Sequence, residues 1–225
     1  MLQRKELSLF YMEQAPEKPD NAPLVLMLHG YGSNEKDLIQ IAPALPPDFR
    51  YISARAPQVM DYGMYGWFPL EFTPNGIIVD HAAAERALHQ LIGFVRELIE
   101  EYRPAGEKVF LMGFSQGTVM SYLTAFNAPE LLHGVIALSG QLPEKNMPTE
   151  KASPLLRKLP FLVMHGLFDE VLPIAKGRAA NAWLEKHVDE LIYREYPIAH
   201  QISDSGIELI RSWLEGLKNK SAHDN

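Results

Sequence analysis

The chain has 225 residues, 47% of them hydrophobic, which is enough for one substantial core. Its net charge of −7 argues against a nucleic-acid backbone or an anionic membrane as the main partner. Cysteine is absent, which excludes disulfides, thiolate-bound metal and a cysteine nucleophile.

No stretch of the sequence has the apolar character of a secretion signal or a membrane span. Residues 1–14 lack a continuous apolar core, and no run approaches the roughly 18 apolar residues that a bilayer requires. The absence of cysteine also fits a reducing compartment. The sequence therefore predicts a cytoplasmic protein without stable membrane insertion.

Apolar runs and turn residues predict alternating strands and helices from the N-terminus onward. Residues 5–13 are expected to form an edge strand, and the continuous apolar run 24–28 a strand buried on both faces. A helix over 37–44 and a short strand over 51–54 follow. Residues 57–79 show no periodicity but are rich in aromatic side chains, namely Tyr62, Tyr65, Trp67, Phe68 and Phe72.

The same alternation continues to the end of the chain. It implies parallel β-α units, and therefore a mostly parallel α/β sheet covered by helices on both faces. We expect a single domain over 1–225, with a polar, disordered tail at about 219–225. The expected elements are a helix at 80–102, a strand at 109–112, a helix from 118, strands at 135–138 and 161–164, a helix at 174–187, a strand at 191–196 and a helix at 204–218.

Residues 113–117, Gly-Phe-Ser-Gln-Gly, match the G-x-S-x-G pattern between an expected strand and an expected helix. A chain that reverses there holds Ser115 in a strained conformation, which lifts its hydroxyl clear of the sheet. Side chains two residues to either side would collide, so Gly113 and Gly117 carry none. The pattern predicts Ser115 as a nucleophile; the alternative is an ordinary capping serine in a glycine-rich turn.

A serine nucleophile needs a base to take its proton, and a carboxylate to hold that base. In a hydrolase of this topology the chain order is serine, acid, histidine. His200 follows a strand end and precedes a helix, where a loop can aim it. His187 belongs to an expected helix and His223 to the polar tail. We therefore predict His200 as the base.

Three carboxylates compete for the role of the acid. Asp169 directly follows the expected strand 161–164, with Glu170 as its near rival and Asp204 as a more distant one. A buried Asp169 would orient the imidazole and stabilise its positive charge during attack. His29 and His165, each followed by Gly at a strand end, are expected to be hydrogen-bonded structural residues rather than catalysts.

Two backbone N–H groups are expected to form the oxyanion hole. One belongs to Gln116, the residue after the nucleophile, and the other to Tyr31 in the His-Gly-Tyr-Gly turn after an earlier strand. We expect no metal and no other cofactor, because neither a His-x-x-x-His pair nor a clustered carboxylate set accompanies His29, His165 and Asp169.

Four segments of the chain carry a family resemblance: LMLHGYGSNEKDL at 26–38, FLMGFSQGTVMS at 110–121, IALSG at 136–140 and MHGLFDEVLPI at 164–174. Together they resemble the phospholipase/carboxylesterase family of α/β-hydrolases, which includes bacterial carboxylesterases and acyl-protein thioesterases. The resemblance covers nearly the whole chain and implies the α/β-hydrolase fold. It also implies hydrolysis of carboxylic esters without a metal, with Ser115, Asp169 and His200 as the triad and Tyr31 and Gln116 at the oxyanion hole.

The resemblance also indicates substrate-binding residues. Trp67 and Phe68 resemble the aromatic pair in the substrate loop of the family, and Leu172 resembles its pocket-lining position. One position departs from the family pattern. Ala199 precedes His200 where the family usually has Gly, and a positive φ at that position would strain an alanine.

The connection between Gly140 and Leu159 is too short for a separate lid domain. The acyl site is therefore expected to be a surface groove, walled by aromatic residues from 60–72 and apolar residues near 167–174. Such a groove predicts a preference for short to medium acyl chains. Plain core packing is the alternative for the aromatic stretch.

The sequence thus predicts a serine carboxylesterase that acts on small ester substrates. A thioesterase or lysophospholipase would use identical machinery, and the sequence leaves these open. From a different class, a non-catalytic ligand-binding domain of the same fold is disfavoured because no triad member is missing. A homodimer through an edge strand or the groove rim also stays open.

Overall fold

The computed structural model describes residues 2–73, 76–143, 145, 147–148 and 152–223. Its centre is an eight-stranded sheet in which β1 and β2 are antiparallel to their neighbours and the strands from β4 to β12 are parallel. The mostly parallel sheet predicted from the sequence is confirmed. The strand order is β1 (Leu2–Glu6), β2 (Phe10–Gln14), β4 (Arg50–Ala54), β3 (Leu24–Leu28), β9 (Val109–Phe114), β10 (Leu132–Leu138), β11 (Phe161–Gly166) and β12 (Leu191–Tyr196).

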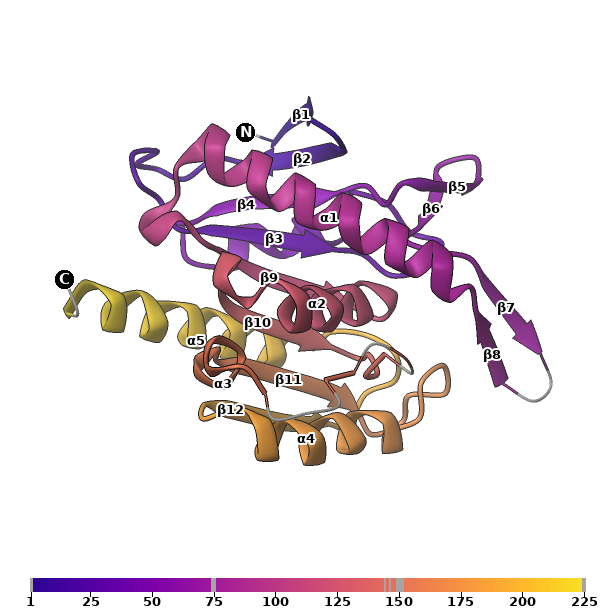
Figure 1. Ribbon diagram of the computed structural model, residues 1–225. Coiled ribbons are helices and arrows are strands. Elements are labelled where there is room, and N and C mark those ends of the chain that lie inside the picture. The colour runs from indigo at the N-terminus through magenta and orange to yellow at the C-terminus, as the bar shows by residue number, and fades with distance from the viewer. Residues whose placement is uncertain (1, 74–75, 144, 146, 149–151, 224–225) are drawn as a thin grey trace.

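Helices cover both faces of the sheet, as Figure 1 shows. On one face lie α1 (His81–Tyr102), α2 (Gln116–Asn127) and α4 (Ala175–His187), and on the other lie η1 (Leu38–Ala44) and α5 (Asp204–His223). Short turns η2 (Ala105–Glu107) and η3 (Pro129–Leu131) and the short helix α3 (Pro154–Lys158) complete the helical elements. Among the described residues, no helix combines the length and hydropathy that a bilayer crossing would require.

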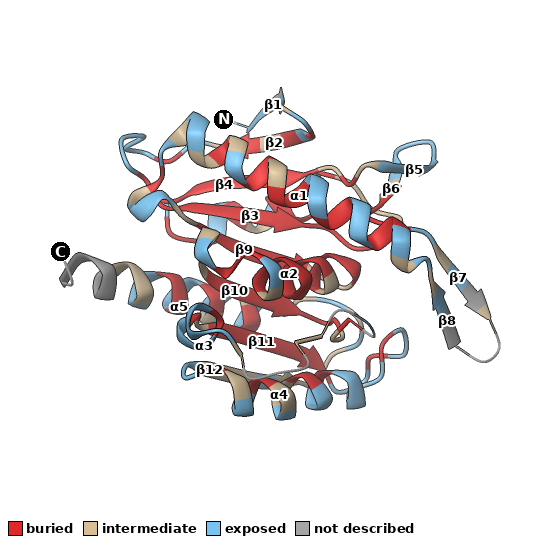
Figure 2. Cartoon of the chain, viewed as in Figure 1, coloured by how far each residue is buried: buried red, intermediate tan, exposed pale blue. Residues whose placement is uncertain are grey.

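Strand β3 shows why the apolar runs are continuous. Its residues alternate between the two cores: Leu24, Leu26 and Leu28 pack under α1 and α2, while Val25 and Met27 pack under η1 and α5. All of β3 is buried, and Figure 2 shows the same for the central strands around it. A strand covered on both faces needs apolar side chains at every position, which hides the usual alternation.

Two expected elements differ in the structure. Residues 5–13 span a turn between β1 and β2, which pair antiparallel, so one expected strand is two. The helix expected at 37–44 is a 3-10 helix that contains Pro43, whose ring cannot fit an α-helix interior and which lacks an N–H. At the C-terminus, α5 continues to His223, over most of the polar tail that was expected to be disordered; residues 224–225 lie outside the described residues.

The aromatic-rich segment 57–79 folds as two β-hairpins. β5 (Gln58–Asp61) pairs with β6 (Met64–Gly66), and β7 (Leu70–Thr73) pairs with β8 (Gly76–Val79). Figure 1 shows β7 and β8 projecting beyond the sheet. All four residues of β5 are exposed, so no buried face imposes the apolar alternation that identifies a strand in a sequence.

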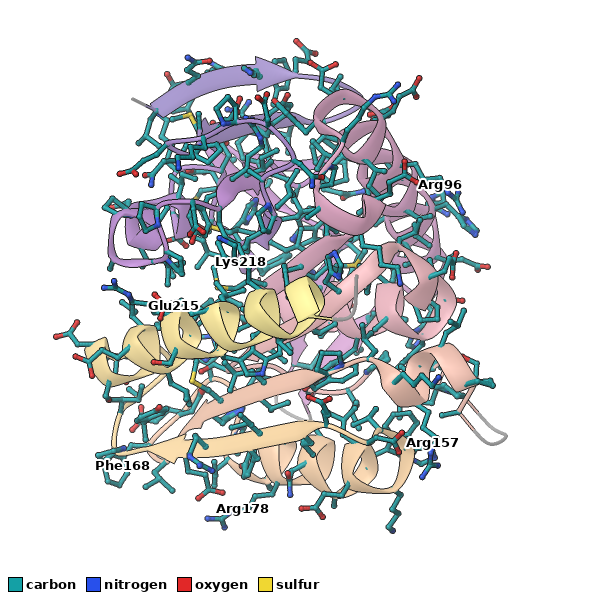
Figure 3. All side chains as sticks on the ribbon, turned by 90° about the vertical axis from the view of Figure 1, so that its left-hand side faces the viewer. Arg96, Arg157, Phe168, Arg178, Glu215 and Lys218 are labelled. Atoms are coloured by element: carbon teal, nitrogen blue, oxygen red, sulfur yellow. The ribbon has the colours of Figure 1, made fainter. Side chains whose placement is uncertain are left out.

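One ion pair ties the last helix, α5, to the rest of the molecule. Lys218 pairs with Asp48 beside η1, whereas the pair between Arg211 and Glu215 lies within the helix. Figure 3 shows Glu215 and Lys218 on α5. Because the Arg211–Glu215 pair is exposed, it contributes little to stability, and the buried apolar face of α5 does most of the anchoring.

Candidate active site

Ser115 lies at the tight turn between β9 and α2, with φ 54° and ψ −115°. Side chains of L-residues rarely adopt this conformation, and it marks a strained position. The two glycines around it are required by space. A Cβ on Gly117 would lie 2.0 Å from the Leu28 carbonyl oxygen, and one on Gly113 would lie 2.3 Å from the Gly117 oxygen. The crowding predicted from the pattern is therefore confirmed.

Thr118 holds this turn against β10, and the sequence analysis did not single it out. Its hydroxyl donates to the Gly113 carbonyl at 2.7 Å and accepts from the Leu138 N–H at 3.0 Å. A threonine in the first turn of a helix gives no sequence signal for such a role, because its partners lie on two separate strands.

His200 and Asp169 form a hydrogen-bonded pair. The Nδ1–H of His200 donates to Oδ2 of Asp169 at 2.7 Å. The other carboxylate oxygen, Oδ1, accepts the N–H groups of Val171 at 3.0 Å and Leu172 at 2.8 Å. Asp169 is only 6% exposed. Its carboxylate is thus fixed on both oxygens, and Nε2 of His200 is the nitrogen left to act as a base.

Contacts between the loops after β11 and β12 bring these two residues together. The Phe168 N–H donates to the Ile198 carbonyl at 3.0 Å, and a Cβ on Gly166 would lie 2.3 Å from the Ala199 oxygen. The Phe168 side chain itself is exposed (Figure 3). Ala199 is not among the residues with positive φ, so its replacement of the usual glycine strains nothing here.

The rival residues lie elsewhere. Glu170 is exposed, and Asp204 is in the first turn of α5. His187 ends α4, where its Nδ1 lies 2.6 Å from the Trp183 carbonyl. Among these candidates the structure brings only Asp169 to His200, so the chain order expected for a triad is matched by geometry.

A cavity of about 320 Å³ opens beside Ser115. His200, Gln116 and Tyr31 also line it, together with the predicted substrate-binding residues Phe68 and Leu172. The ring of Phe114 lies 4.8 Å from that of His200 and supports it. No hydrogen bond joins Ser115 to His200 among the described residues; such contacts often tighten only when substrate binds. The remaining apolar lining is Leu70, Val79, Ala84, Val119, Pro143 and Val171.

The two candidate oxyanion donors lie beside the serine. A Cβ on Gly30 would be 3.3 Å from the Ser115 Cβ, so the chain that leads to Tyr31 passes directly next to the nucleophile. Gln116 begins α2, where the first N–H groups of a helix lack an intrahelical acceptor. Both positions are compatible with donors to an oxyanion.

Trp67 differs from its predicted role in substrate binding. Its side chain is 1% exposed, lies outside the cavity lining, and donates its indole N–H to the His29 carbonyl at 3.0 Å. The Gln116 side chain accepts the Trp67 N–H at 2.8 Å and donates to the Phe68 carbonyl at 2.7 Å. Core packing therefore accounts for Trp67, while Phe68 forms the cavity wall.

His29 is the structural histidine that was expected. It is fully buried, with Nδ1–H donating to the Gly30 carbonyl at 2.7 Å and Nε2 accepting the Ala56 N–H at 3.1 Å. Burial lowers the pKa of His29 below its usual range. A proton on Nε2 would face the Ala56 N–H, so the folded state requires the neutral ring.

We expect acidification to destabilise the protein through His29. The unfolded state binds a proton near the usual pKa of about 6.5, while the folded state binds it only at lower pH. The stability that the neutral ring contributes is therefore complete above about pH 6.5 and falls as the pH drops below it, by up to about 1.4 kcal/mol per pH unit. Urea unfolding at pH 7.5 and 5.5 measures this, and His29→Gln should flatten the dependence. An imidazole of His29 that titrates near pH 6.5 by NMR would contradict it.

Within the described parts of the chain, no group of three or more His, Asp or Glu side chains is arranged to hold a metal ion.

The parallel sheet, the strained serine between β9 and α2, and the His200–Asp169 pair at the ends of the last strands define an α/β-hydrolase fold. The chain belongs to the phospholipase/carboxylesterase family, whose model matches residues 12–218.

Known proteins of this kind are similar to the chain over most of its length. A probable carboxylesterase of Oryza sativa subsp. japonica is 27% identical, with 91% of this chain and 82% of the relative covered. The crystal structure of esterase PE8 has a TM-score of 0.80 at 28% identity, covering 96% of this chain and 99% of that one. A probable inactive carboxylesterase of the same rice is 24% identical, covering 95% of this chain and 92% of that protein. Family membership alone therefore does not establish activity.

Proposed function

We propose that the protein is a serine carboxylesterase that hydrolyses short- to medium-chain carboxylic esters. Ser115 is the nucleophile, His200 the general base and acid, and Asp169 the orienting acid. The observation that carries the proposal is the 2.7 Å contact between His200 Nδ1 and Asp169 Oδ2, with His200 lining the same cavity as Ser115.

The reaction proceeds in two halves. In the first, Nε2 of His200 takes the hydroxyl proton of Ser115 as the oxygen attacks the ester carbonyl, and then gives that proton to the leaving alcohol. In the second, His200 takes a proton from a water that attacks the acyl-serine and returns that proton to the Ser115 oxygen as the acid is released. The N–H groups of Tyr31 and Gln116 stabilise the oxyanion of each tetrahedral intermediate.

The cavity supports the proposed acyl length. Its volume of about 320 Å³ lies at the lower end of the range of about 300–1,000 Å³ for small-molecule sites. Phe68, Leu70 and Leu172 give it apolar walls. His81, Gln141 and Lys145 also line the cavity, so its walls are mostly but not entirely apolar. A small cavity with mostly apolar walls favours an acyl group of limited length.

The test is a chain-length series of nitrophenyl esters: acetate, butyrate, octanoate and palmitate. We expect kcat/KM to peak at butyrate or octanoate and to fall steeply at palmitate. A fluorophosphonate probe should label the protein once, and peptide mass spectrometry should place the label on Ser115. Best turnover of palmitate would overturn the proposed substrate class, and a protein that neither turns over esters nor takes the label would resemble its inactive relative. Faster hydrolysis of matched thioesters would favour the thioesterase alternative.

A further inference from the structure

A second histidine lies next to the acid of the site. His165, at the end of β11, is 2% exposed. Its Nε2 lies 2.7 Å from the Leu172 carbonyl oxygen and 3.4 Å from Oδ2 of Asp169. The proposed mechanism uses neither nitrogen of this ring, so its burial beside Asp169 needs an explanation.

The other nitrogen fixes the tautomer of His165. Among the described residues Nδ1 is buried without a hydrogen-bond partner. The backbone of α4 closes that side, because a Cβ on Gly177 would lie 2.8 Å from Nδ1. A proton on Nδ1 would be a buried donor without an acceptor, which is costly. The proton is therefore on Nε2, where it is donated to Leu172.

Glu195 on β12 does not provide His165 with a further partner. Glu195 is paired in register with His165 on β12, yet its carboxylate accepts both arms of the Arg178 guanidinium at 2.8 and 2.9 Å. These hydrogen bonds lower the pKa of Glu195 to about 2. Arg178 lies on the outer surface of α4 (Figure 3), so the Arg178–Glu195 pair is separate from the Nε2 contact.

The Leu172 peptide joins His165 to the site. Its N–H donates to Oδ1 of Asp169 at 2.8 Å, its carbonyl accepts from His165, and its side chain lines the cavity. Oδ2 of Asp169 then holds His200 at 2.7 Å. One buried N–H thus anchors the turn 169–172, which carries both the acid and a wall of the acyl site.

We propose that His165 is a positioning residue: by holding the Leu172 carbonyl, it fixes the turn that aims Asp169 at His200 and sets the position of the Leu172 wall. This inference rests on the proposed function of the same site. It assigns no proton transfer to His165, whose ring stays neutral throughout the reaction.

Two substitutions distinguish the hydrogen bond that His165 donates to Leu172 from the packing of its ring. The amide nitrogen of His165→Gln can occupy the place of Nε2 and keep the donor, whereas that of His165→Asn reaches only the place of Nδ1. We expect His165→Gln to stay within about 10-fold of wild type in kcat. We expect His165→Asn to lose about 10²-fold, as a misplaced catalytic group does.

The comparison of the two variants supplies a readout that packing alone would not move. A loss of packing at His165 would lower kcat in both variants, whereas a loss of the Nε2–H donor to Leu172 lowers it only in His165→Asn. Equal kcat in the two variants would overturn the inference.

A measurement on the wild-type protein covers the case in which His165→Asn does not fold. Histidine ¹⁵N NMR should show His165 neutral, with a proton on Nε2 that exchanges slowly with solvent, and no proton on Nδ1. A proton on Nδ1, or rapid exchange at Nε2, would overturn the inference without any assay of activity. Wild type that is inert toward all esters would instead refute the proposed function, so the two failures are distinguishable.

Discussion

Replacing Ser115 by Ala is expected to lower kcat for nitrophenyl butyrate by about 10⁶-fold, which corresponds to about 8 kcal/mol of transition-state stabilisation. The variant keeps the cavity and the backbone donors but has no oxygen to form the acyl-enzyme. Only binding and the oxyanion hole remain, which together leave an acceleration of about 10³–10⁴ over water. Steady-state kinetics with enzyme in high concentration measures the residual rate.

Ser139 provides a matched control for this variant. Like Ser115, it is a serine with positive φ, here 44°, and it directly follows β10. It is buried and lies outside the cavity lining. Ser139→Ala removes the same atom from a similar backbone, so we expect its kcat to stay within a few-fold of wild type. A loss of less than 100-fold in Ser115→Ala, or equal losses in the two variants, would contradict the nucleophile assignment.

The sequence carried enough information to predict most of the sheet and the pairing of His200 with Asp169. Strand β3, the turn at Ser115 and the loop that carries Asp169 each have local signals: an apolar run, a glycine-flanked serine and a carboxylate at a strand end. The parallel topology then brings the carboxyl ends of the strands to one edge. Each signal could be recognised locally, because it is confined to a few residues, and the order of these signals along the chain then predicted which of them lie close together.

The features that the sequence did not reveal depend on contacts between distant segments. Trp67 was predicted to touch substrate, yet its neighbours in space are His29 and Gln116, and no periodicity in 57–79 announces them. The sequence likewise does not indicate the contact between His165 and Leu172, because a histidine followed by glycine at a strand end can have many different structural roles. What a side chain donates to is decided by tertiary packing, so such roles require coordinates.

Replacing Asp169 by Asn is expected to lower kcat by about 10⁴-fold near neutral pH. The Asn oxygen can still accept the N–H groups of Val171 and Leu172, which now bind Oδ1. The amide nitrogen then replaces Oδ2 and donates toward Nδ1 of His200. That contact forces the imidazole proton onto Nε2, where it blocks the removal of the serine proton. The unprotonated nitrogen would then be Nδ1, which faces residue 169 and cannot accept the proton of Ser115.

A substitution of Glu170 tests whether the loss of kcat arises from the specific position of Asp169 or only from the removal of one negative charge from the loop. It is adjacent in sequence, exposed, and was the nearest rival for the role of the acid. Glu170→Gln makes the same change of charge without touching His200, so we expect kcat to change by less than about 3-fold, in line with the weak influence of exposed charges. A large loss in Glu170→Gln with little loss in Asp169→Asn would reverse the assignment. The expected pattern would show that the 2.7 Å contact between Asp169 and His200, rather than the net charge of the loop, sets the tautomer on which catalysis depends.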